Sequence, residues 1–155
     1  MQDMRQNQPW FCPSAEKADR VKRILIIEDS DQNLYLMTFI LEKKGYEVVP
    51  ACNGRRGIEL ASQVEPALIL LDIQLPIMGG YAAAQELRKN PALAAVPIVA
   101  VTSYAMYGDR ERILAAGCTG YIEKPINPEM FTAEIERYLS NHSGDMIDHG
   151  NSPDS

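Results

Sequence analysis

The chain has 155 residues and a formal net charge of −6, and 46% of its residues are hydrophobic. This length is typical of one domain with a full hydrophobic core, and no apolar run approaches the length of a membrane span. The acidic balance argues against a DNA-binding surface, which needs clustered lysine and arginine. The start of the chain lacks the apolar core of a signal peptide, so the sequence predicts a cytoplasmic protein.

Histidine and cysteine are too few and too scattered for the common catalytic centres built on them. His142 and His149 are the only histidines, and both lie near the end of the sequence. Their position argues against histidine-based catalysis, a histidine metal site in the core and a phosphorylated histidine. Cys12, Cys52 and Cys118 show neither pairing nor metal-ligand spacing, so we expect reduced thiols.

Polar segments at both ends flank the part of the sequence that we expect to fold. Residues 1–21 mix Gln, Asn, Pro and charged residues without a sustained period, which predicts a flexible N-terminal arm. Residues 141–155 are polar and contain Gly and Ser, which predicts a disordered tail. The folded domain is therefore predicted to span residues 22–140.

Strands and helices alternate five times along this domain. Aliphatic runs bounded by turn residues predict strands at 23–27, 46–51, 68–72, 96–102 and 120–124. Helical spacing of apolar residues and capping residues predict helices at 31–44, 58–62, 81–89 and 109–116, and a last helix that begins at its cap Asn127. Such alternation is typical of a doubly wound α/β fold, with a parallel sheet between two layers of helices.

Polar residues stand where four of the predicted strands end. They are Glu28 and Asp29 after the first strand, Asp72 in the third, Thr102 in the fourth and Lys124 in the fifth. Taken singly, Asp72 is more often a turn residue, Glu28 or Asp29 equally well caps a helix, and Lys124 is an ordinary surface charge. In a parallel sheet, however, the carboxyl ends of the strands meet at one edge, where ligands bind.

Three carboxylates brought together at that edge need compensation. At a few ångströms they repel by about 3–4 kcal/mol per pair at an effective dielectric constant near 20. Carboxylate oxygens suit Mg²⁺, or Mn²⁺ in its place, and argue against Zn²⁺. The Thr102 hydroxyl and the Lys124 ammonium are groups that surround a phosphoryl in phosphoryl-transfer sites. Asp72 is then left as a nucleophile that forms an acyl phosphate.

Four segments resemble the motifs of the response-regulator receiver family, in the family's order and spacing. They are Ile-Ile-Glu-Asp at 26–29, Leu-Leu-Asp-Ile-Gln-Leu-Pro at 70–76, Val-Thr-Ser at 101–103 and Glu-Lys-Pro-Ile at 123–126. The resemblance covers about residues 22–140 and is strongest to single-domain receivers of the DivK kind, although similar segments occur in receivers attached to hybrid kinases. It implies a flavodoxin-like fold with strand order 2-1-3-4-5 and five helices.

The resemblance also implies a role for each site residue. Asp72 would be the phosphoacceptor, and Glu28, Asp29, Asp72 and the backbone carbonyl of Gln74 would bind Mg²⁺. Thr102 and Lys124 would bind the phosphoryl group, and Tyr121, otherwise an ordinary half-buried aromatic, would form a switch pair with Thr102. The side chains of Gln74, Ser103 and Tyr104 would tune the reactivity of the phosphoryl group. The Lys124–Pro125 peptide bond would be cis.

Three residues depart from the family pattern. Glu28 stands where Asp is commoner and is one methylene longer, which alters the geometry around a metal. Gly79 replaces a frequent Asp and so removes a helix cap. Ser103 replaces a frequent Ala beside the switch hydroxyl.

The expected function is that of a phosphorelay response regulator in a two-component system. A histidine kinase or a histidine phosphotransfer protein would supply the phosphoryl group. Output would go to a downstream protein, with the chain as a monomer or a phosphorylation-linked dimer, because the polar tail is too short for an effector domain. The candidate contact surface lies near Tyr107, Arg110, Glu111 and Arg137, where a plain solvated face is an equally good interpretation.

Two alternatives remain open at this level. One is a pseudo-receiver, a binding module that keeps the fold and acts without phosphorylation. The other is a phosphohydrolase that works through an aspartyl phosphate, but such enzymes need an acid where this chain has Gln74, and no cap domain is present to hold a substrate. We expect no enzymatic activity beyond self-phosphorylation and self-dephosphorylation.

Overall fold

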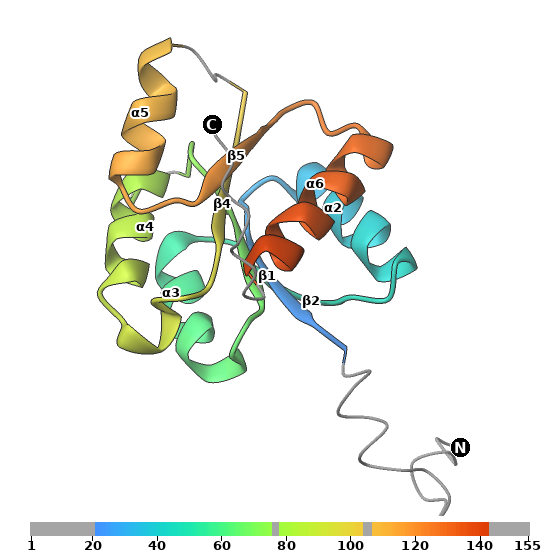
Figure 1. Ribbon diagram of the computed structural model, residues 1–155, viewed down its shortest axis with the longest axis horizontal. Coiled ribbons are helices and arrows are strands. Elements are labelled where there is room, and N and C mark those ends of the chain that lie inside the picture. Colours follow the sequence, from blue (N-terminus) through green and yellow to red (C-terminus); the bar gives the residue numbers. More distant parts are fainter. Residues whose placement is uncertain (1–20, 76–77, 104–106, 143–155) are drawn as a thin grey trace, which may run out of the picture.

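Five parallel strands form the centre of the molecule, in the order β2-β1-β3-β4-β5 (Figure 1). The computed structural model describes residues 21–75, 78–103 and 107–142. The strands are β1 (Arg23–Ile27), β2 (Glu47–Ala51), β3 (Leu68–Asp72), β4 (Ile98–Thr102) and β5 (Gly120–Glu123). The predicted parallel sheet and its order are therefore confirmed.

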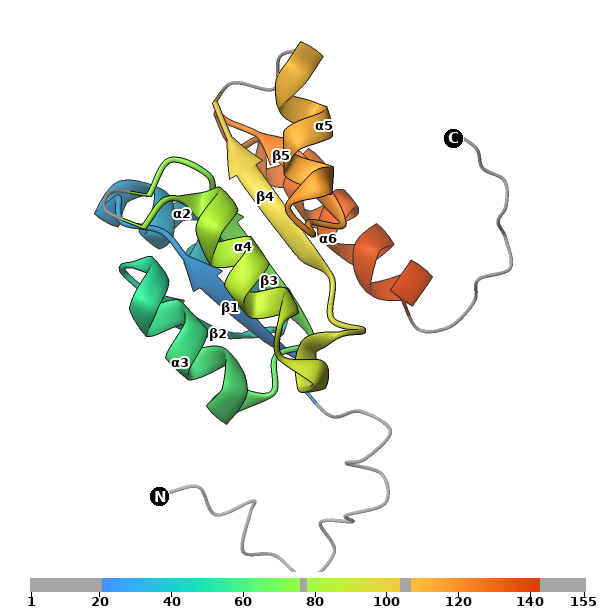
Figure 2. The ribbon, with the colours of Figure 1, turned by 90° about the vertical axis from the view of Figure 1, so that its left-hand side faces the viewer.

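Helices cover both faces of the sheet. They are α2 (Asp31–Lys43), α3 (Gly54–Val64), α4 (Gly80–Arg88), α5 (Tyr107–Ala115) and α6 (Pro128–His142), with a short 3₁₀ helix, η2 (Pro91–Leu93), after α4. Figure 1 shows α3, α4 and α5 on one face of the sheet and α2 and α6 on the other, and Figure 2 looks onto the face that α3 and α4 cover. None of the helices in the described ranges has the length and apolar character to cross a membrane.

Alternate residues of the strands belong to two separate hydrophobic cores, one on each face of the sheet. Ile24 and Ile26 of β1 pack with residues of α2 and α6, whereas Leu25 and Ile27 pack with residues of α3, α4 and α5. All five residues of β3 and of β4 are buried. Because both faces of a central parallel strand lie under helices, such strands are aliphatic throughout, which explains why the sequence located them well.

The structure shifts several predicted boundaries. Helix α3 begins at Gly54 rather than residue 58, because the Asn53 side chain caps it and accepts the Arg56 N–H at 2.8 Å. Strand β4 begins at Ile98 rather than residue 96. The short helix η2 was not predicted; Asn90 caps it by accepting the Ala92 N–H at 2.9 Å. Helix α6 continues to His142, into the segment predicted as a tail.

The remaining parts of the predicted arm and tail, residues 1–20 and 143–155, lie outside the described residues, as does Cys12. Cys52 is exposed and Cys118 is buried, and both are free thiols, as expected. Burial raises the pKa of the Cys118 thiol to about 11, so it is protonated and unreactive at neutral pH.

Two glycines, Gly79 and Gly80, allow helix α4 to begin close to the end of β3. Gly79 has a φ of 81°, a conformation that residues with a side chain rarely adopt. At Gly80, a Cβ atom would overlap the backbone of Ile73 and would lie 2.7 Å from the carbonyl oxygen of Asp72. The first turn of α4 therefore packs directly on the backbone that follows Asp72.

Substitution of Gly80 by alanine is expected to destabilise the fold. The methyl group meets backbone atoms that cannot rotate away, so we expect Gly80→Ala to lower the free energy of unfolding by about 1–3 kcal/mol. Gly54→Ala is the matched control, because Gly54 also begins a helix but its Cβ would meet only the flexible Met78 side chain, at 3.0 Å. Chemical denaturation measures both; a Gly80→Ala protein as stable as wild type contradicts this close packing of α4.

Candidate functional site

Three carboxylates from two strands gather at the carboxyl edge of the sheet. Glu28 and Asp29 directly follow β1, and Asp72 is the last residue of β3. Each offers one oxygen atom, and these atoms all lie within 4.8 Å of one another. Glu28 is 1% exposed and Asp72 is 3% exposed, whereas Asp29 is exposed. The acidic cluster predicted from the strand ends is thus present.

Neither Glu28 nor Asp29 is the N-cap of the neighbouring helix α2. Ser30 is the N-cap of α2, and its hydroxyl oxygen accepts the Asn33 N–H at 3.3 Å. Glu28 and Asp29, which could each have been this cap, are therefore left for another purpose. Asp72 does make a turn contact, because its Oδ1 accepts the Gln74 N–H at 3.0 Å. That bond fixes the carboxylate without using both of its oxygens.

Lys124 brings one positive charge into the cluster. Its Nζ lies 3.5 Å from Asp72 Oδ1 and 3.6 Å from Glu28 Oε1, and its side chain is 13% exposed. The peptide bond that follows, Lys124–Pro125, is cis, as the family resemblance implied. One ammonium does not balance three carboxylates, so the ionised site keeps an excess of negative charge.

The environment of Glu28 disfavours the ionised form of its carboxyl group. Its pKa is raised from 4.5 to about 7, mainly by burial and then by the negative charge of Asp72, while the positive charge of Lys124 opposes both effects. Glu28 Oε2 accepts the Ser30 N–H at 3.3 Å, but no described residue donates a hydrogen bond to the buried Oε1. A buried carboxylate oxygen without a donor indicates that a cation or a proton belongs beside it.

The residues present fit Mg²⁺. All three side chains offer hard oxygen atoms, the cluster has an excess of negative charge, and Asp29 keeps one side open to water. Mg²⁺ is typically held by one or two carboxylates and several waters, so such a partly open cluster suits it better than an enclosed cage.

The predicted switch and tuning residues lie around the cluster to different degrees. Thr102 ends β4 and is buried, and its carbonyl accepts the Lys124 N–H at 2.8 Å. The side chains of Gln74 and Ser103 are exposed. Tyr104 lies outside the described residues. Tyr121, on β5, is half-buried and packs against the core shared with α3, α4 and α5.

The departures at residues 79 and 103 have visible consequences. Gly79 is the N-cap of α4 and makes no side-chain capping bond, as expected from the missing Asp. Its positive φ is a further reason for glycine at this position, and the family pattern did not indicate it. Ser103 is exposed.

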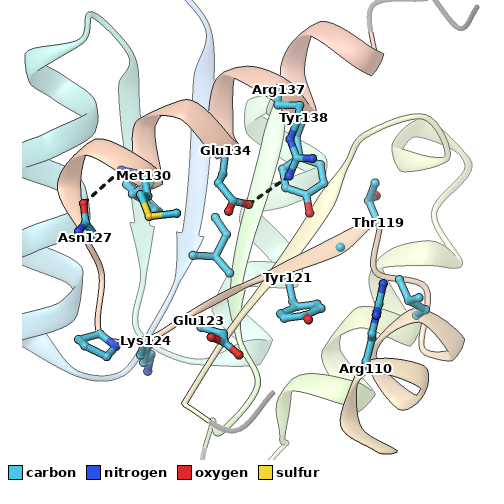
Figure 3. Close-up of a pocket in the computed structure, with 15 residues that line it drawn as sticks. Arg110, Thr119, Tyr121, Glu123, Lys124, Asn127, Met130, Glu134, Arg137 and Tyr138 are labelled. Atoms are coloured by element: carbon cyan, nitrogen blue, oxygen red, sulfur yellow. Dashed lines mark hydrogen bonds and ion pairs between the residues drawn. The ribbon is translucent and has the colours of Figure 1, made fainter. Parts of the chain in front are cut away.

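A groove of about 680 Å³ lies between α5 and α6, along the free edge of β5 (Figure 3). Arg110, Glu134 and Arg137 line it, together with Tyr121 and Tyr138. It contains part of the predicted contact surface: Arg110 and Arg137 line the groove, Glu111 does not, and the Tyr107 side chain lies outside the described residues. Sequence reasoning missed Leu114 and Met130, which also line the groove and are 46% and 60% exposed.

Comparison with known proteins agrees with this geometry. A model of the response regulator receiver domain family matches residues 24–136. The chain is 41% identical over 118 residues to the polar-differentiation response regulator DivK of Brucella anthropi, an alignment that covers 76% of this chain and 96% of the relative. The DivK of Brucella ovis is 40% identical with the same coverage.

Solved structures show the same fold. The chemotaxis protein CheY4 of Vibrio cholerae superposes with a TM-score of 0.74 at 26% identity, over 76% of this chain and 98% of that one. The receiver domain of the Pseudomonas aeruginosa sensor histidine kinase PA1611, which has a magnesium ion coordinated in its active-site cleft, has a TM-score of 0.72 at 32% identity, over 77% and 98% of the two chains. The acidic cluster at the sheet edge, the strand order and these matches together establish that the chain belongs to the response-regulator receiver family.

Proposed function

We propose that this chain is a phosphorelay response regulator in which Mg²⁺-dependent phosphorylation of Asp72 switches a protein contact surface. The observation that carries this proposal is the setting of Asp72. It is a buried carboxylate that lies 3.5 Å from the Lys124 ammonium and shares an acidic cluster with Glu28 and Asp29. This arrangement combines a nucleophile, a cation for the incoming phosphoryl group and ligands for a metal.

Each group has a part in the transfer. An Asp72 oxygen attacks the phosphorus of a phosphohistidine on a histidine kinase or phosphotransfer protein; a P–O bond forms, the P–N bond breaks, and its electron pair stays on the imidazole. Lys124 pairs with a phosphoryl oxygen, and the Thr102 hydroxyl donates a hydrogen bond to another. Glu28, Asp29, Asp72 and the Gln74 carbonyl would hold Mg²⁺, which when bound neutralises charge on the phosphoryl oxygens.

The new phosphoryl group carries a charge of about −2 and acts as the switch. Thr102 moves toward it, and Tyr121 turns into the space that is freed. The chain then populates an active state that it already samples at a low level without phosphorylation. The buried position of Thr102 and the half-buried position of Tyr121, on the adjacent strands β4 and β5, support this coupling.

Output is a change in protein binding at the groove between α5 and α6. Tyr121 lines this groove, so a change in its position alters the surface that a partner meets. Exposed Leu114 and Met130 supply apolar contact area, and Arg110 and Arg137 supply charge. These features support a downstream protein as the target. The proposal places the chain in a cytoplasmic pathway, as a monomer or as a dimer formed on phosphorylation.

The test is the response of the protein to Mg²⁺ with beryllofluoride, which imitates a phosphoryl group on a carboxylate. We expect amide resonances from the ends of β3, β4 and β5 to shift when both are added, and not when Mg²⁺ is left out. No response would favour the phosphorylation-independent pseudo-receiver. Continuing release of phosphate from an added phosphoester would favour a phosphohydrolase.

A further inference from the structure

Tyr138 of α6 lies directly on the strand that carries the switch tyrosine. A Cβ atom at Gly120, the first residue of β5, would overlap the Tyr138 hydroxyl and would lie 2.7 Å from its Cζ. Glycine at this position therefore leaves the space that the phenol fills. The ring also packs beside the core shared by α2 and α6, and the Arg137 guanidinium lies 5.2 Å from its centre.

The Tyr138 hydroxyl lies against β5 at Gly120, the residue next to Tyr121. Lys124 donates its N–H to Thr102 of β4, and alternate residues of a strand direct their N–H groups to opposite sides, so the N–H of Tyr121 is directed away from β4. Burial raises the pKa of Tyr138, so the phenol is neutral at physiological pH, and the backbone N–H of Tyr121 opposes this rise in pKa.

The two tyrosines lie on opposite sides of one strand. Figure 3 shows Tyr138 on the α6 side of β5 and Tyr121 on the other side, with both rings in the groove. Among the described residues, β5 is the edge strand of the sheet and pairs with β4 alone, and α5 and α6 lie on either side of the groove along its other edge. A displacement of Tyr121 therefore acts on the backbone that Tyr138 touches.

We propose that Tyr138 is a positioning residue for the switch: its hydroxyl holds β5 at Gly120–Tyr121 in the unphosphorylated position and couples movement of Tyr121 to α6. This inference rests on the proposed function, because it assumes that phosphorylation moves Tyr121. It assigns α6 an active part in the transition, since release of the hydroxyl from β5 must accompany the inward turn of Tyr121. Groove residues on α6, such as Met130 and Glu134, then shift with the switch.

The conservative variant Tyr138→Phe tests this directly, because it keeps the ring and removes only the hydroxyl. If the hydroxyl restrains the inactive position, the variant is easier to activate, and half-maximal conversion at fixed Mg²⁺ needs about three- to tenfold less beryllofluoride, the factor expected for one hydrogen-bond-sized interaction. Tyr46→Phe is the matched control: Tyr46 is another half-buried tyrosine beside the α2 and α6 core, and it does not line the groove.

A purely structural role gives a different result. It lowers the stability of Tyr138→Phe to denaturant but leaves its beryllofluoride midpoint within about twofold of wild type, as for Tyr46→Phe, and this outcome overturns the proposal. A midpoint that moves to higher concentration also overturns it. In the Tyr121→Ala background, we expect the shift caused by Tyr138→Phe to disappear, because the coupled residue is gone. Wild-type protein that does not respond to beryllofluoride at all contradicts the proposed function instead.

Discussion

Replacement of Asp72 by asparagine is expected to abolish phosphorylation by acetyl phosphate and Mg²⁺. The carboxamide oxygen is a far weaker nucleophile than a carboxylate and forms no stable acyl phosphate, so the chemistry is lost while the side-chain shape is kept. The oxygen of asparagine can still accept the Gln74 N–H that Asp72 Oδ1 accepts at 3.0 Å, so the fold is preserved. Intact-protein mass spectrometry after incubation measures the incorporation.

Asp109→Asn is the control for this experiment. Asp109 lies on α5, pairs with Arg112 at 3.8 Å and belongs to no part of the acidic cluster. Its variant should incorporate phosphoryl to the wild-type level. Phosphoryl label that persists on Asp72→Asn at the wild-type level would show that another residue is the acceptor.

Replacement of Glu28 by glutamine is expected to stabilise the metal-free protein at alkaline pH. The pKa of Glu28 is about 7 in the folded state and 4.5 for an unperturbed glutamate, so the folded protein binds the proton more tightly than the unfolded chain does. Protonated Glu28 therefore contributes to the free energy of unfolding, and this contribution is complete below pH 4.5 and is lost as the pH rises through 7. At pH 8 the free energy of unfolding is lower by about 3 kcal/mol as a result. A glutamine side chain is neutral at every pH, so the variant does not lose this stability.

Denaturation of wild type and Glu28→Gln at pH 5 and pH 8, with and without Mg²⁺, measures this effect. Without metal we expect the variant to be more stable at pH 8, by up to about 3 kcal/mol, and close to wild type at pH 5. Saturating Mg²⁺ should stabilise wild type at pH 8 and stabilise the variant much less, because a ligand is lost. Glu42→Gln, an exposed position on α2, is the control. Equal stabilities at pH 8 in the absence of metal would contradict this role of Glu28.

Much of the fold follows from local sequence. The runs at 24–27, 68–71 and 98–101 are aliphatic without interruption because both faces of these strands lie under helices, and this pattern is difficult to mistake. The residues at their carboxyl ends are brought to one edge by topology alone, so the sequence was enough to place Glu28, Asp29 and Asp72 together. The alternation of strands and helices along the sequence predicted a parallel sheet, and hence this topology.

Long-range contacts could not be predicted in the same way. Arg88 ends α4, and its guanidinium donates at 2.8 Å to the carbonyl oxygens of Leu93, Val96 and Gly117. In the sequence it is only a charge in the last turn of a helix, because the carbonyls that it binds lie in η2, in the segment before β4 and in the turn after α5. Tyr138 is a similar case. The sequence predicts the last helix, but the position of Tyr138 on Gly120 depends on how α6 crosses β5.

Boundaries failed where capping outweighed hydrophobic pattern. The first turn of α3 contains Gly54, Arg55, Arg56 and Gly57, which carry no apolar signal, and the helix begins there because Asn53 caps it. Likewise, the sequence allowed Glu28 or Asp29 as a helix cap, whereas the structure shows that Ser30 caps α2. This result matters for function, since it leaves both preceding acids available for the proposed metal site.

The most direct test of the central claim is to locate the phosphoryl group. After incubation with acetyl phosphate and Mg²⁺, borohydride reduction converts an aspartyl phosphate into homoserine, and peptide sequencing by mass spectrometry identifies the position. We predict homoserine at residue 72, dependent on Mg²⁺. Modification at a different acidic residue, or none at residue 72 while the folded protein binds Mg²⁺, would contradict the assignment of Asp72 as the phosphoacceptor.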